Sequence, residues 1–441
     1  MENLLVITHY FEKDGVMGSV RWTNLSHRLS KDFNVYVLTH GDNLGEKEFR
    51  VSKSKNVNVI EVDNLSSYVK RSQKRHSGNK KEFIPPAFSQ PTKTTLKSKL
   101  KALLRFILQT ASLKKRAKLN YKILQPYLKE KGIKFDYVIS TSRPFINSYT
   151  AKHFSTSHKA KWILDQRDLP LSEEANCVEF RLFKKEFKKL DKHVFRYTIV
   201  SKGMKDGLGY LYDFTPKMMD KVYVLYNGYT QADKQEKEQP FSKDKLTFAF
   251  TGDLYEGKRD LTMLLDAIRR LIDQGKCCEQ DFIIQYAGNA SESLLYQAKP
   301  FNLEGIINDN GRVKHSQAVK MQNSADILLL PTWNTQRDQG ILTGKIYEYM
   351  LAEKPILCIT TGEIPNGEAT QTINELNLGI AVETCNYEAG IEKLKDYLLM
   401  QLENKKQAKE LFFNPNKKGV ARFDHDNLVE ELKNILKMEK I

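Results

Sequence analysis

The sequence lacks the features of a membrane-spanning or secreted chain. It contains no run of about 18 or more consecutive apolar residues, so no transmembrane helix is expected. The N-terminus enters an apolar segment, Leu4–Thr8, without the basic region, longer apolar stretch and small-residue cleavage site of a signal peptide. We therefore expect the protein to stay in the cytoplasm.

Cysteine is scarce and has no recognisable spacing. The five cysteines form no CxxC pair and have no His partners at metal-ligand spacing; they are Cys177, Cys277, Cys278, Cys358 and Cys385. An odd number of cysteines in a cytoplasmic chain indicates free thiols, and a zinc site is not expected. No DxD motif follows a predicted strand, so we expect neither a bound metal nor another cofactor.

Acidic residues are nearly missing from one segment. Between Val69 and Lys122 the sequence has sixteen Lys or Arg and one acid, Glu82, which is almost the whole excess of the chain's formal charge of +16. Such a concentration predicts an anionic partner: a membrane leaflet, a nucleic acid or a lipid phosphate. The alternative is a solvated, lysine-rich surface helix.

What the sequence does contain is a repeated alternation of strands and helices. Strands are expected at 4–8, 35–39, 57–60, 137–140, 161–164, 198–200 and 222–225, and in a second series at 247–250, 282–286, 327–330, 355–359 and 379–382. Helices are expected at about 20–29, 146–155, 176–193, 203–212, 260–273, 316–323, 344–353 and 388–402. This alternation predicts an α/β fold with two parallel sheets, in domains at 1–229 and 246–418 joined by a polar linker at 230–245. Ligands of such folds bind at the carboxyl ends of the strands, in a cleft between the two domains.

The basic segment is predicted to contain an amphipathic helix. Residues 66–95 are polar and Pro-containing, and indicate an irregular insertion that makes 66–125 an addition to the first domain. From Leu96 to Ala111 apolar residues recur at helical spacing between Lys and Arg. This pattern suits a helix that lies in a membrane interface. It equally suits a helix that packs on its own domain.

A helix start in the second domain suits a diphosphate. The helix begins at Thr343-Gly344, where free backbone N–H groups and the positive end of the dipole favour an anion. Glu348 lies one turn further on the same face, where its carboxylate can accept hydrogen bonds from ribose hydroxyls. The alternative is that Lys345 and Glu348 are ordinary surface residues.

The segment Lys345-Ile346-Tyr347-Glu348-Tyr349 through Lys354-Pro355-Ile356-Leu357 resembles the donor motif KxxEYxxAGKPIL of glycosyltransferase family 4 and its GT-B relatives. Six further segments resemble other elements of these enzymes and occur in the expected order. They are Asp14–Gly18 with Arg21, Trp162–Leu169, Val200–Lys202, Tyr226–Tyr229, Phe250–Arg259 and Phe423–Leu436. The resemblance implies two Rossmann-like domains facing each other across a cleft, with an acceptor domain at 1–229, a donor domain at 246–418 and a helix at 419–441 that returns to the first domain.

The resemblance also implies a chemistry. A nucleotide-sugar donor would bind mainly to the second domain without a metal, and transfer would retain the anomeric configuration. Catalytic roles fall on Lys258, Arg259, Asp168 and Arg167, and donor binding on Gly15, Gly18, Gly252, Thr343, Gly344, Lys345 and Glu348. The acceptor would lie near Arg143 and Asp165, although Asp165 and Asp168 could equally be loop-capping carboxylates.

Two positions depart from the family pattern. Many members have a second glutamate eight positions before the one at Glu348, where this chain has Gly340. Members also commonly place a His after the strand at 162–164, where this chain has Gln166-Arg167-Asp168. The usual contacts of those two residues with the transferred sugar are therefore unassigned.

The resemblance implies the function of a glycosyltransferase in capsule, exopolysaccharide or O-antigen synthesis, acting on a glycan or polyprenyl-diphosphate acceptor. The basic segment 69–122 would hold it at the inner face of the cytoplasmic membrane as a peripheral protein. One alternative is another GT-B nucleotide-sugar enzyme, such as a 2-epimerase. A second is a non-catalytic module that binds nucleic acid, but no nucleic-acid motif or interleaved aromatic pattern supports it, and no nucleic-acid partner is expected.

Overall fold

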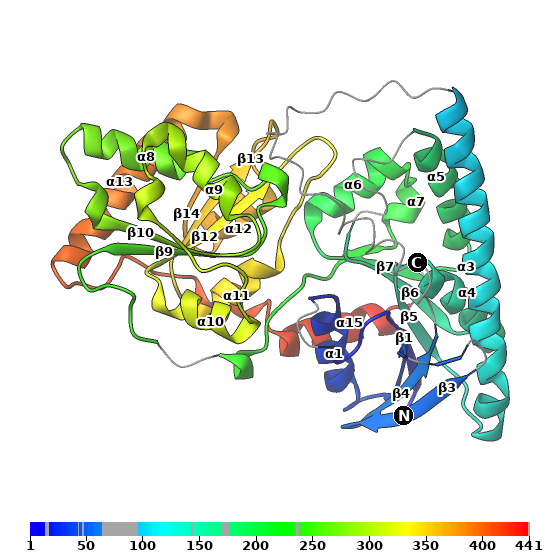
Figure 1. Cartoon of the computed structure of the whole chain (residues 1–441). Coiled ribbons are helices and arrows are strands. Elements are labelled where there is room, and N and C mark those ends of the chain that lie inside the picture. Colours follow the sequence, from blue (N-terminus) through cyan, green and yellow to red (C-terminus); the bar gives the residue numbers. More distant parts are fainter. Residues whose placement is uncertain are drawn as a thin grey trace. The chain divides into compact units, whose positions relative to one another are not determined.

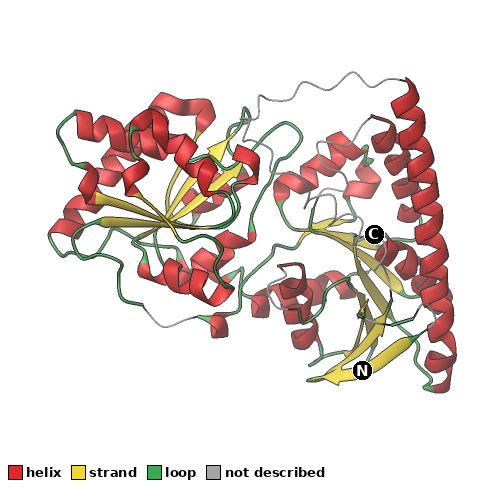
Figure 2. Cartoon of the chain, in the orientation of Figure 1, coloured by secondary structure: helices red, strands yellow, loops and turns green. Residues whose placement is uncertain are grey.

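The computed structural model describes residues 1–13, 17–42, 44–45, 48–63, 96–142, 144–168, 177–234 and 238–439. They form two compact units. Unit 1 runs to Asn227 and resumes at His425, and unit 2 takes Gly228–Asp424 (Figure 1). Each unit has one sheet with helices on both faces, so the predicted α/β class is confirmed (Figure 2).

The sheet of unit 1 has the strand order β3-β4-β2-β1-β5-β6-β7-β8. The strands are β1 (Asn3–Ile7), β2 (Asn34–His40), β3 (Phe49–Ser54), β4 (Val57–Val62), β5 (Tyr137–Thr141), β6 (Lys161–Gln166), β7 (Arg196–Ile199) and β8 (Val222–Val224). All neighbours are parallel except β3, which pairs antiparallel with β4 at the edge. Continuous apolar runs such as the one in β1 are buried on both faces, as parallel strands covered by helices require.

The helices of unit 1 are α1 (Met17–Leu29), α3 (Leu96–Glu130), α4 (Ile146–His158), α5 (Cys177–Asp191), α6 (Lys202–Tyr212), α7 (Pro216–Met219) and α15 (His425–Lys437). The last helix, α15, buries Leu428, Leu432 and Ile435 in the same apolar core as α1 and the central strands. Arg196 of β7 is almost fully buried and donates to three carbonyls at the end of this helix, those of Ile435, Met438 and Glu439, at 2.8, 3.1 and 2.6 Å. The final helix therefore belongs structurally to unit 1.

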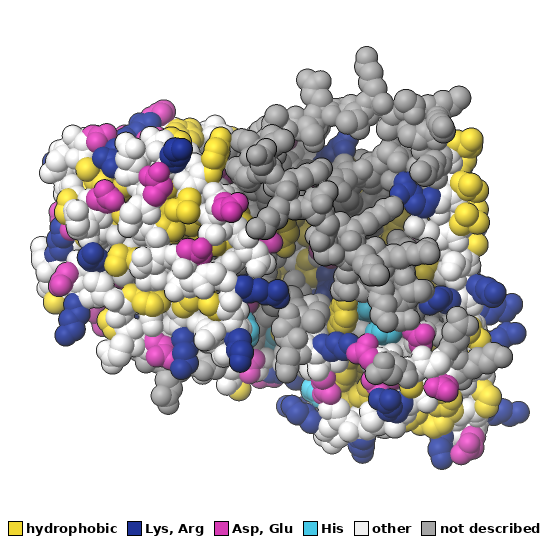
Figure 3. Space-filling model, in the orientation of Figure 1, with side chains coloured by type: hydrophobic (Ala, Val, Ile, Leu, Met, Phe, Trp, Pro, Cys, Tyr) yellow, Lys and Arg dark blue, Asp and Glu magenta, His cyan; other side chains and the backbone are white. Residues whose placement is uncertain are grey.

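Helix α3 has two different halves. Its C-terminal half packs on α4 and α5, with Ala117, Leu124 and Leu128 buried. Its N-terminal half exposes four large apolar side chains, which we call the α3 stripe: Leu100 (67%), Leu104 (58%), Ile107 (50%) and Leu108 (62%). Figure 3 shows apolar side chains gathered along this half of the helix. The sequence left open whether the apolar face of this helix packs on its own domain; among the described side chains, the fully buried ones lie in the C-terminal half and the exposed α3 stripe lies in the N-terminal half.

Unit 2 has a parallel sheet with the order β11-β10-β9-β12-β13-β14. The strands are β9 (Leu246–Thr251), β10 (Phe282–Ala287), β11 (Ile307–Asp309), β12 (Ile327–Trp333), β13 (Ile356–Thr361) and β14 (Gly379–Glu383). The helices are α8 (Thr262–Asp273), α9 (Ser291–Ala298), α10 (His315–Ser324), α11 (Gly344–Ala352), α12 (Glu368–Glu375), α13 (Tyr387–Lys406) and α14 (Lys417–Ala421). One face of this sheet packs with α8, α9 and α13 in an apolar core of unit 2, separate from the core that α15 joins in unit 1.

The strand order of unit 2 defines where a ligand can bind. The chain builds the sheet outward from β9 through β10 to β11, and then returns to β12 on the other side of β9. Strands β9 and β12 pair through two residues each, Phe248 with Ile327 and Ala249 with Leu328. The last two residues of β9, Phe250 and Thr251, therefore extend beyond the ladder with β12. Ligands of open α/β sheets bind at this reversal of strand order, outside the carboxyl ends of the strands.

Candidate functional site

The loops that follow β9 and β12 meet at the carboxyl edge of the unit 2 sheet. They bring together two cations, two aromatic rings and one carboxylate, which we call the cation–aromatic cluster: Tyr255, Lys258, Arg259, Trp333 and Asp338. The rings of Tyr255 and Trp333 lie 5.6 Å apart, tilted by 49°. The ammonium of Lys258 lies 5.4 Å from the Trp333 ring, and the guanidinium of Arg259 lies 4.5 Å from the Tyr255 ring. Cations attract the faces of aromatic rings, which allows two like charges to be held side by side.

The two cations of this cluster differ in exposure. The Lys258 side chain is 45% exposed, and its ammonium lies 3.7 Å from the Asp338 carboxylate, a long and solvent-screened ion pair. Arg259 is buried, and its Nη1 donates to the carbonyl of Asp253 at 2.8 Å. Burial lowers the pKa of Arg259 from its ordinary value, but an arginine stays charged at neutral pH. The cluster therefore has one positive charge in a fixed position, on Arg259, and one on an exposed side chain that can move, on Lys258.

Asp338 is held as well. Its Oδ2 accepts from Trp333 Nε1 at 3.2 Å, and its backbone N–H donates to Thr335 Oγ1 at 3.1 Å. The start of the same loop is bound to β13: Asn334 N–H donates to the carbonyl of Thr361 at 2.7 Å. Gly362 has φ +117°, and a Cβ there would lie 2.3 Å from the Asn334 carbonyl, so only glycine allows this close approach. The loop after β12 is thus fastened at its base.

Helix α11 follows the loop that carries Asp338. Its N-cap residue, Thr343, makes no side-chain cap, and its hydroxyl oxygen is buried without a hydrogen-bond partner among the described residues. The first N–H groups of a helix have no intrahelical partners and carry the positive end of its dipole. With Lys258 and Arg259 nearby in the loop after β9, this edge of the sheet is suited to a diphosphate.

The carboxylate of Glu348, one turn into α11, is held through one oxygen. Oε2 accepts from Lys345 Nζ at 2.8 Å and from Gln322 Nε2 at 3.1 Å. The ammonium of Lys345 is therefore paired with the Glu348 carboxylate, and its charge is not directed at a ligand anion alone. Gln322 comes from α10 and is 1% exposed, and its Nε2 also donates to Thr251 Oγ1 at 2.8 Å. Gly252, the next residue after Thr251, donates its N–H to the Ala287 carbonyl at 2.9 Å.

Three of the predicted site residues of unit 1 that the structure describes are Gly18, Arg167 and Asp168. Gly18 and Arg167 are adjacent: a Cβ at Gly18 would lie 2.7 Å from Arg167 Nη1. Asp168 is exposed. Gly15 and Arg143, the remaining predictions in this part of the chain, lie outside the described residues.

Asp165 is fully buried at the end of β6. Its carboxylate accepts from Arg21 Nη2 at 3.0 Å, Trp22 Nε1 at 2.8 Å and Thr198 Oγ1 at 2.8 Å. It therefore joins α1, β6 and β7 within unit 1. These contacts favour the structural interpretation of this carboxylate over contact with an acceptor.

A second polar group lies at the carboxyl edge of the unit 1 sheet. The ring of His9, which follows β1, stacks on that of His40 with centroids 5.0 Å apart. Burial lowers the pKa of His9 to about 4, and the neighbouring His40 and Lys13 also disfavour its charged form, while Asp42 opposes them. His9 is therefore neutral at physiological pH.

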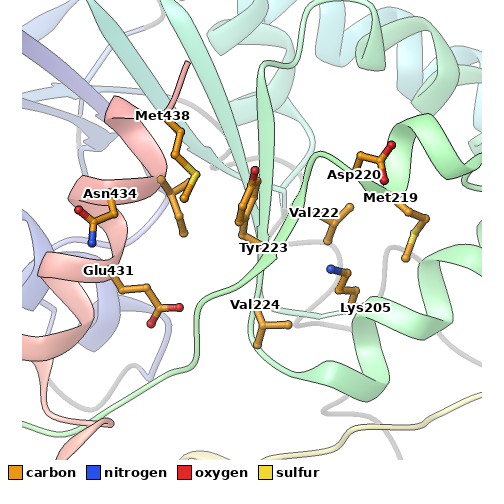
Figure 4. A pocket seen from close by; sticks show the side chains of 10 residues that line it. Lys205, Met219, Asp220, Val222, Tyr223, Val224, Glu431, Asn434 and Met438 are labelled. Carbon is orange, nitrogen blue, oxygen red and sulfur yellow. The ribbon is translucent and has the colours of Figure 1, made fainter. Parts of the chain in front are cut away.

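A pocket of about 560 Å³ lies elsewhere in unit 1, between α6, α7, the edge strand β8 and α15 (Figure 4). Its polar lining residues are Lys205, Asp220, Glu431 and Asn434. None of the predicted site residues that the structure describes lines it. In the same described ranges, no three His, Cys, Asp or Glu side chains come together as a metal site, and no helix has the length and apolar character needed to cross a bilayer.

Sequence reasoning did not find Gln322, Thr251 or Trp333. The hydrogen-bond partners of Gln322 lie 71 and 26 positions away in the chain, so no short sequence motif indicates that it belongs to the site. Trp333 ends a buried strand, which makes it indistinguishable by pattern from a core residue. An aromatic residue at the end of a strand that flanks the reversal of strand order is the one signal that could have pointed to it.

Comparison with known proteins gives a match for unit 2. Residues 245–398 match the family model described as glycosyl transferases group 1. Among curated proteins, none matches the sequence.

Solved structures match over almost the whole chain. Sucrose-phosphate synthase from Thermosynechococcus elongatus is 10% identical, with a TM-score of 0.58 over 99% of this chain and 98% of that one. HepE from Anabaena, in complex with UDP and glucose, is 12% identical, with a TM-score of 0.55 over 99% of both chains. An E. coli structure described as trehalose-6-phosphate bound with UDP-2-fluoro glucose is 12% identical, with a TM-score of 0.63 over 100% of both chains. The chain therefore has the fold of GT-B glycosyltransferases, and its residues 245–398 have the sequence pattern of glycosyl transferases group 1.

Proposed function

We propose that the chain is a glycosyltransferase of the family 4 type that moves a sugar from a nucleotide-sugar donor to a hydroxyl of an acceptor. The observation that carries the proposal is the pair of cations at the reversal of strand order in unit 2, at the sheet edge from which the loop after β12 leads to the uncapped start of α11. The same unit has the group 1 sequence pattern, and two structures of the same fold are described with UDP or a UDP-sugar bound.

In this proposal the donor diphosphate lies against Lys258, Arg259 and the N–H groups at Thr343-Gly344. Charge develops on the diphosphate as the glycosidic bond to it breaks, and fixed cations stabilise that charge without a metal. Glu348 accepts from the ribose. Transfer retains the anomeric configuration, as the resemblance to family 4 implies.

The acceptor is proposed to be a glycan or a polyprenyl-diphosphate-linked sugar, in the synthesis of capsule, exopolysaccharide or O-antigen. In unit 1, Arg167 beside Gly18 supplies a positive charge for it. The chain is proposed to act at the inner face of the cytoplasmic membrane, bound to anionic lipid through residues 69–122. The α3 stripe and Arg105, on the described part of that segment, give the helix both apolar and basic contacts for such a surface.

The proposal is tested by offering the full chain a panel of nucleotide sugars and nucleoside diphosphates. A ligand at about 100 times its Kd stabilises the protein by about 2.7 kcal/mol, which a thermal shift detects. Hits are then tested for transfer to polyprenyl-diphosphate-linked acceptors. Stabilisation by a nucleotide sugar followed by transfer supports the proposal. Donor turnover without any acceptor supports a 2-epimerase instead, and no binding of any nucleotide sugar overturns both.

A further inference from the structure

The carboxamide of Gln322 ties three elements of unit 2 together. Gln322 lies on α10 and is 1% exposed, Thr251 is the last residue of β9, and Glu348 lies on α11. Nε2 of Gln322 donates to the Thr251 hydroxyl at 2.8 Å and to Glu348 Oε2 at 3.1 Å. Because a carboxylate only accepts hydrogen bonds, the amide group that faces Glu348 must be the NH2 group. Both of its protons have partners, so the amide is fixed.

This arrangement leaves the two oxygens of Glu348 unequal. Oε2 receives two donors, the Gln322 amide and the Lys345 ammonium. Oε1 has no hydrogen-bond partner in the described part of the chain, and the Glu348 side chain keeps 18% of its surface exposed. The carboxylate is thus held through one oxygen, and the other remains able to accept from a ligand.

We infer that Gln322 is a positioning residue for the donor: it holds Glu348 so that Oε1 accepts from a hydroxyl of the donor's ribose. This inference rests on the proposed function, because it requires a nucleotide at the start of α11. Lys345 alone would not fix the orientation of the Glu348 carboxylate, because a lysine ammonium is a point charge on a flexible side chain. The buried Gln322 amide, which is itself held by Thr251, donates in one direction and so fixes the orientation of the carboxylate.

The decisive measurement is selectivity for the ribose hydroxyls rather than affinity alone. The Kd of the full chain is measured by calorimetry for UDP, GDP and ADP, and for the 2′,3′-dideoxy form of each. A hydrogen bond to a charged group contributes enough for the wild type to favour the ribose form by about tenfold or more. In Gln322→Leu the preference is expected to fall close to one, because Glu348 is no longer directed at the sugar.

Three further variants separate positioning from general support of the fold. Glu348→Ala is expected to lose the preference, and adding Gln322→Leu to it is expected to change little more, because the two residues act as one unit. Gln371→Leu, on α12 and outside the site, removes a side-chain hydrogen bond of 2.8 Å to the Asn366 carbonyl and is expected to keep the wild-type preference. If Gln322→Leu does not fold, Gln322→Asn, which shortens the reach by one methylene, takes its place and is expected to lose preference in the same direction.

The outcomes distinguish this inference from the proposed function. If no nucleoside diphosphate binds the wild type, the proposed function fails and the inference fails with it. If the wild type binds one but does not distinguish ribose from dideoxyribose, only the inference is overturned. It is also overturned if Gln322→Leu weakens both forms equally, or weakens binding as much in the Glu348→Ala background as in the wild type.

Discussion

At the residue scale, the cation–aromatic cluster concentrates positive charge where the proposal needs it. We expect Lys258→Ala to lower turnover about a hundredfold with the fold intact, since losing one donor to a developing oxyanion costs about 3 kcal/mol. Arg259→Ala is expected to have a similar effect. Steady-state rates at saturating donor give the measurement, with Lys299→Ala, an exposed lysine outside the site, as the control. Wild-type rates in both variants would show that the site has been misplaced.

His9 makes the stability of unit 1 depend on pH. Its folded pKa of about 4 lies below the ordinary 6.5, so the unfolded chain binds the proton more tightly. Its contribution is fully present above pH 6.5 and is lost as the pH falls toward 4. As the pH falls from 6.5 toward 4, the unfolding free energy of the wild type should decrease by at most about 3 kcal/mol more than that of His9→Gln. This limit follows from about 1.36 kcal/mol for each unit by which the folded and unfolded pKa values differ. Urea unfolding of both proteins between pH 7 and 4.5 measures it, and parallel curves would contradict the prediction.

At the scale of single elements, the α3 stripe is a row of four large apolar side chains that lie exposed on one helix. We expect the chain to sediment with vesicles containing anionic lipid, less as salt rises, and little with neutral vesicles. Replacing Leu104 and Ile107 by Ser should weaken this binding without changing thermal stability, because both side chains are already exposed. Leu124→Ser, in the buried half of the same helix, should instead lower stability. Equal sedimentation with neutral and anionic vesicles would remove the membrane from the proposal.

The same scale shows what the sequence could and could not predict. Strands with continuous Val, Ile and Leu runs, such as β1 and β12, were predicted because burial on both faces leaves that pattern. The sequence did not predict β3, whose residues 50–53 lie exposed at the sheet edge, or β11, which has three residues. The start of α11 was predicted at Gly344, as the structure has it. The partners of Asp165, and Gln322 as a partner of Glu348, could not be predicted, because they come from segments distant in the chain.

At the scale of the whole molecule, the described residues of unit 2 all lie within Gly228–Asp424 and have their own core. We expect the fragment 228–424 to fold and to bind the same nucleoside diphosphate as the full chain, with a Kd within about tenfold, or 1.4 kcal/mol. Calorimetry on the two proteins makes the comparison. A folded fragment that binds no nucleotide recognised by the full chain would place the donor contacts elsewhere.

The proposed charge stabilisation also determines how the full chain responds to chelators. Because Lys258, Arg259 and the start of α11 would neutralise the diphosphate, we expect EDTA to leave turnover unchanged, and added Mg²⁺ to restore nothing. Initial rates with and without EDTA test this. A loss of activity that Mg²⁺ reverses would show that a cation takes part.

The placement of α15 has a consequence for how the protein is made. The described residues of unit 1 lie on both sides of Gly228–Asp424, and the carbonyls that accept from Arg196, those of Ile435, Met438 and Glu439, are translated after that whole stretch. On the ribosome, unit 2 can complete its core while the earlier unit still lacks α15. Until residues 425–439 leave the ribosome, the earlier part of the nascent polypeptide therefore keeps an apolar surface open to solvent and an Arg196 guanidinium without these three carbonyl partners.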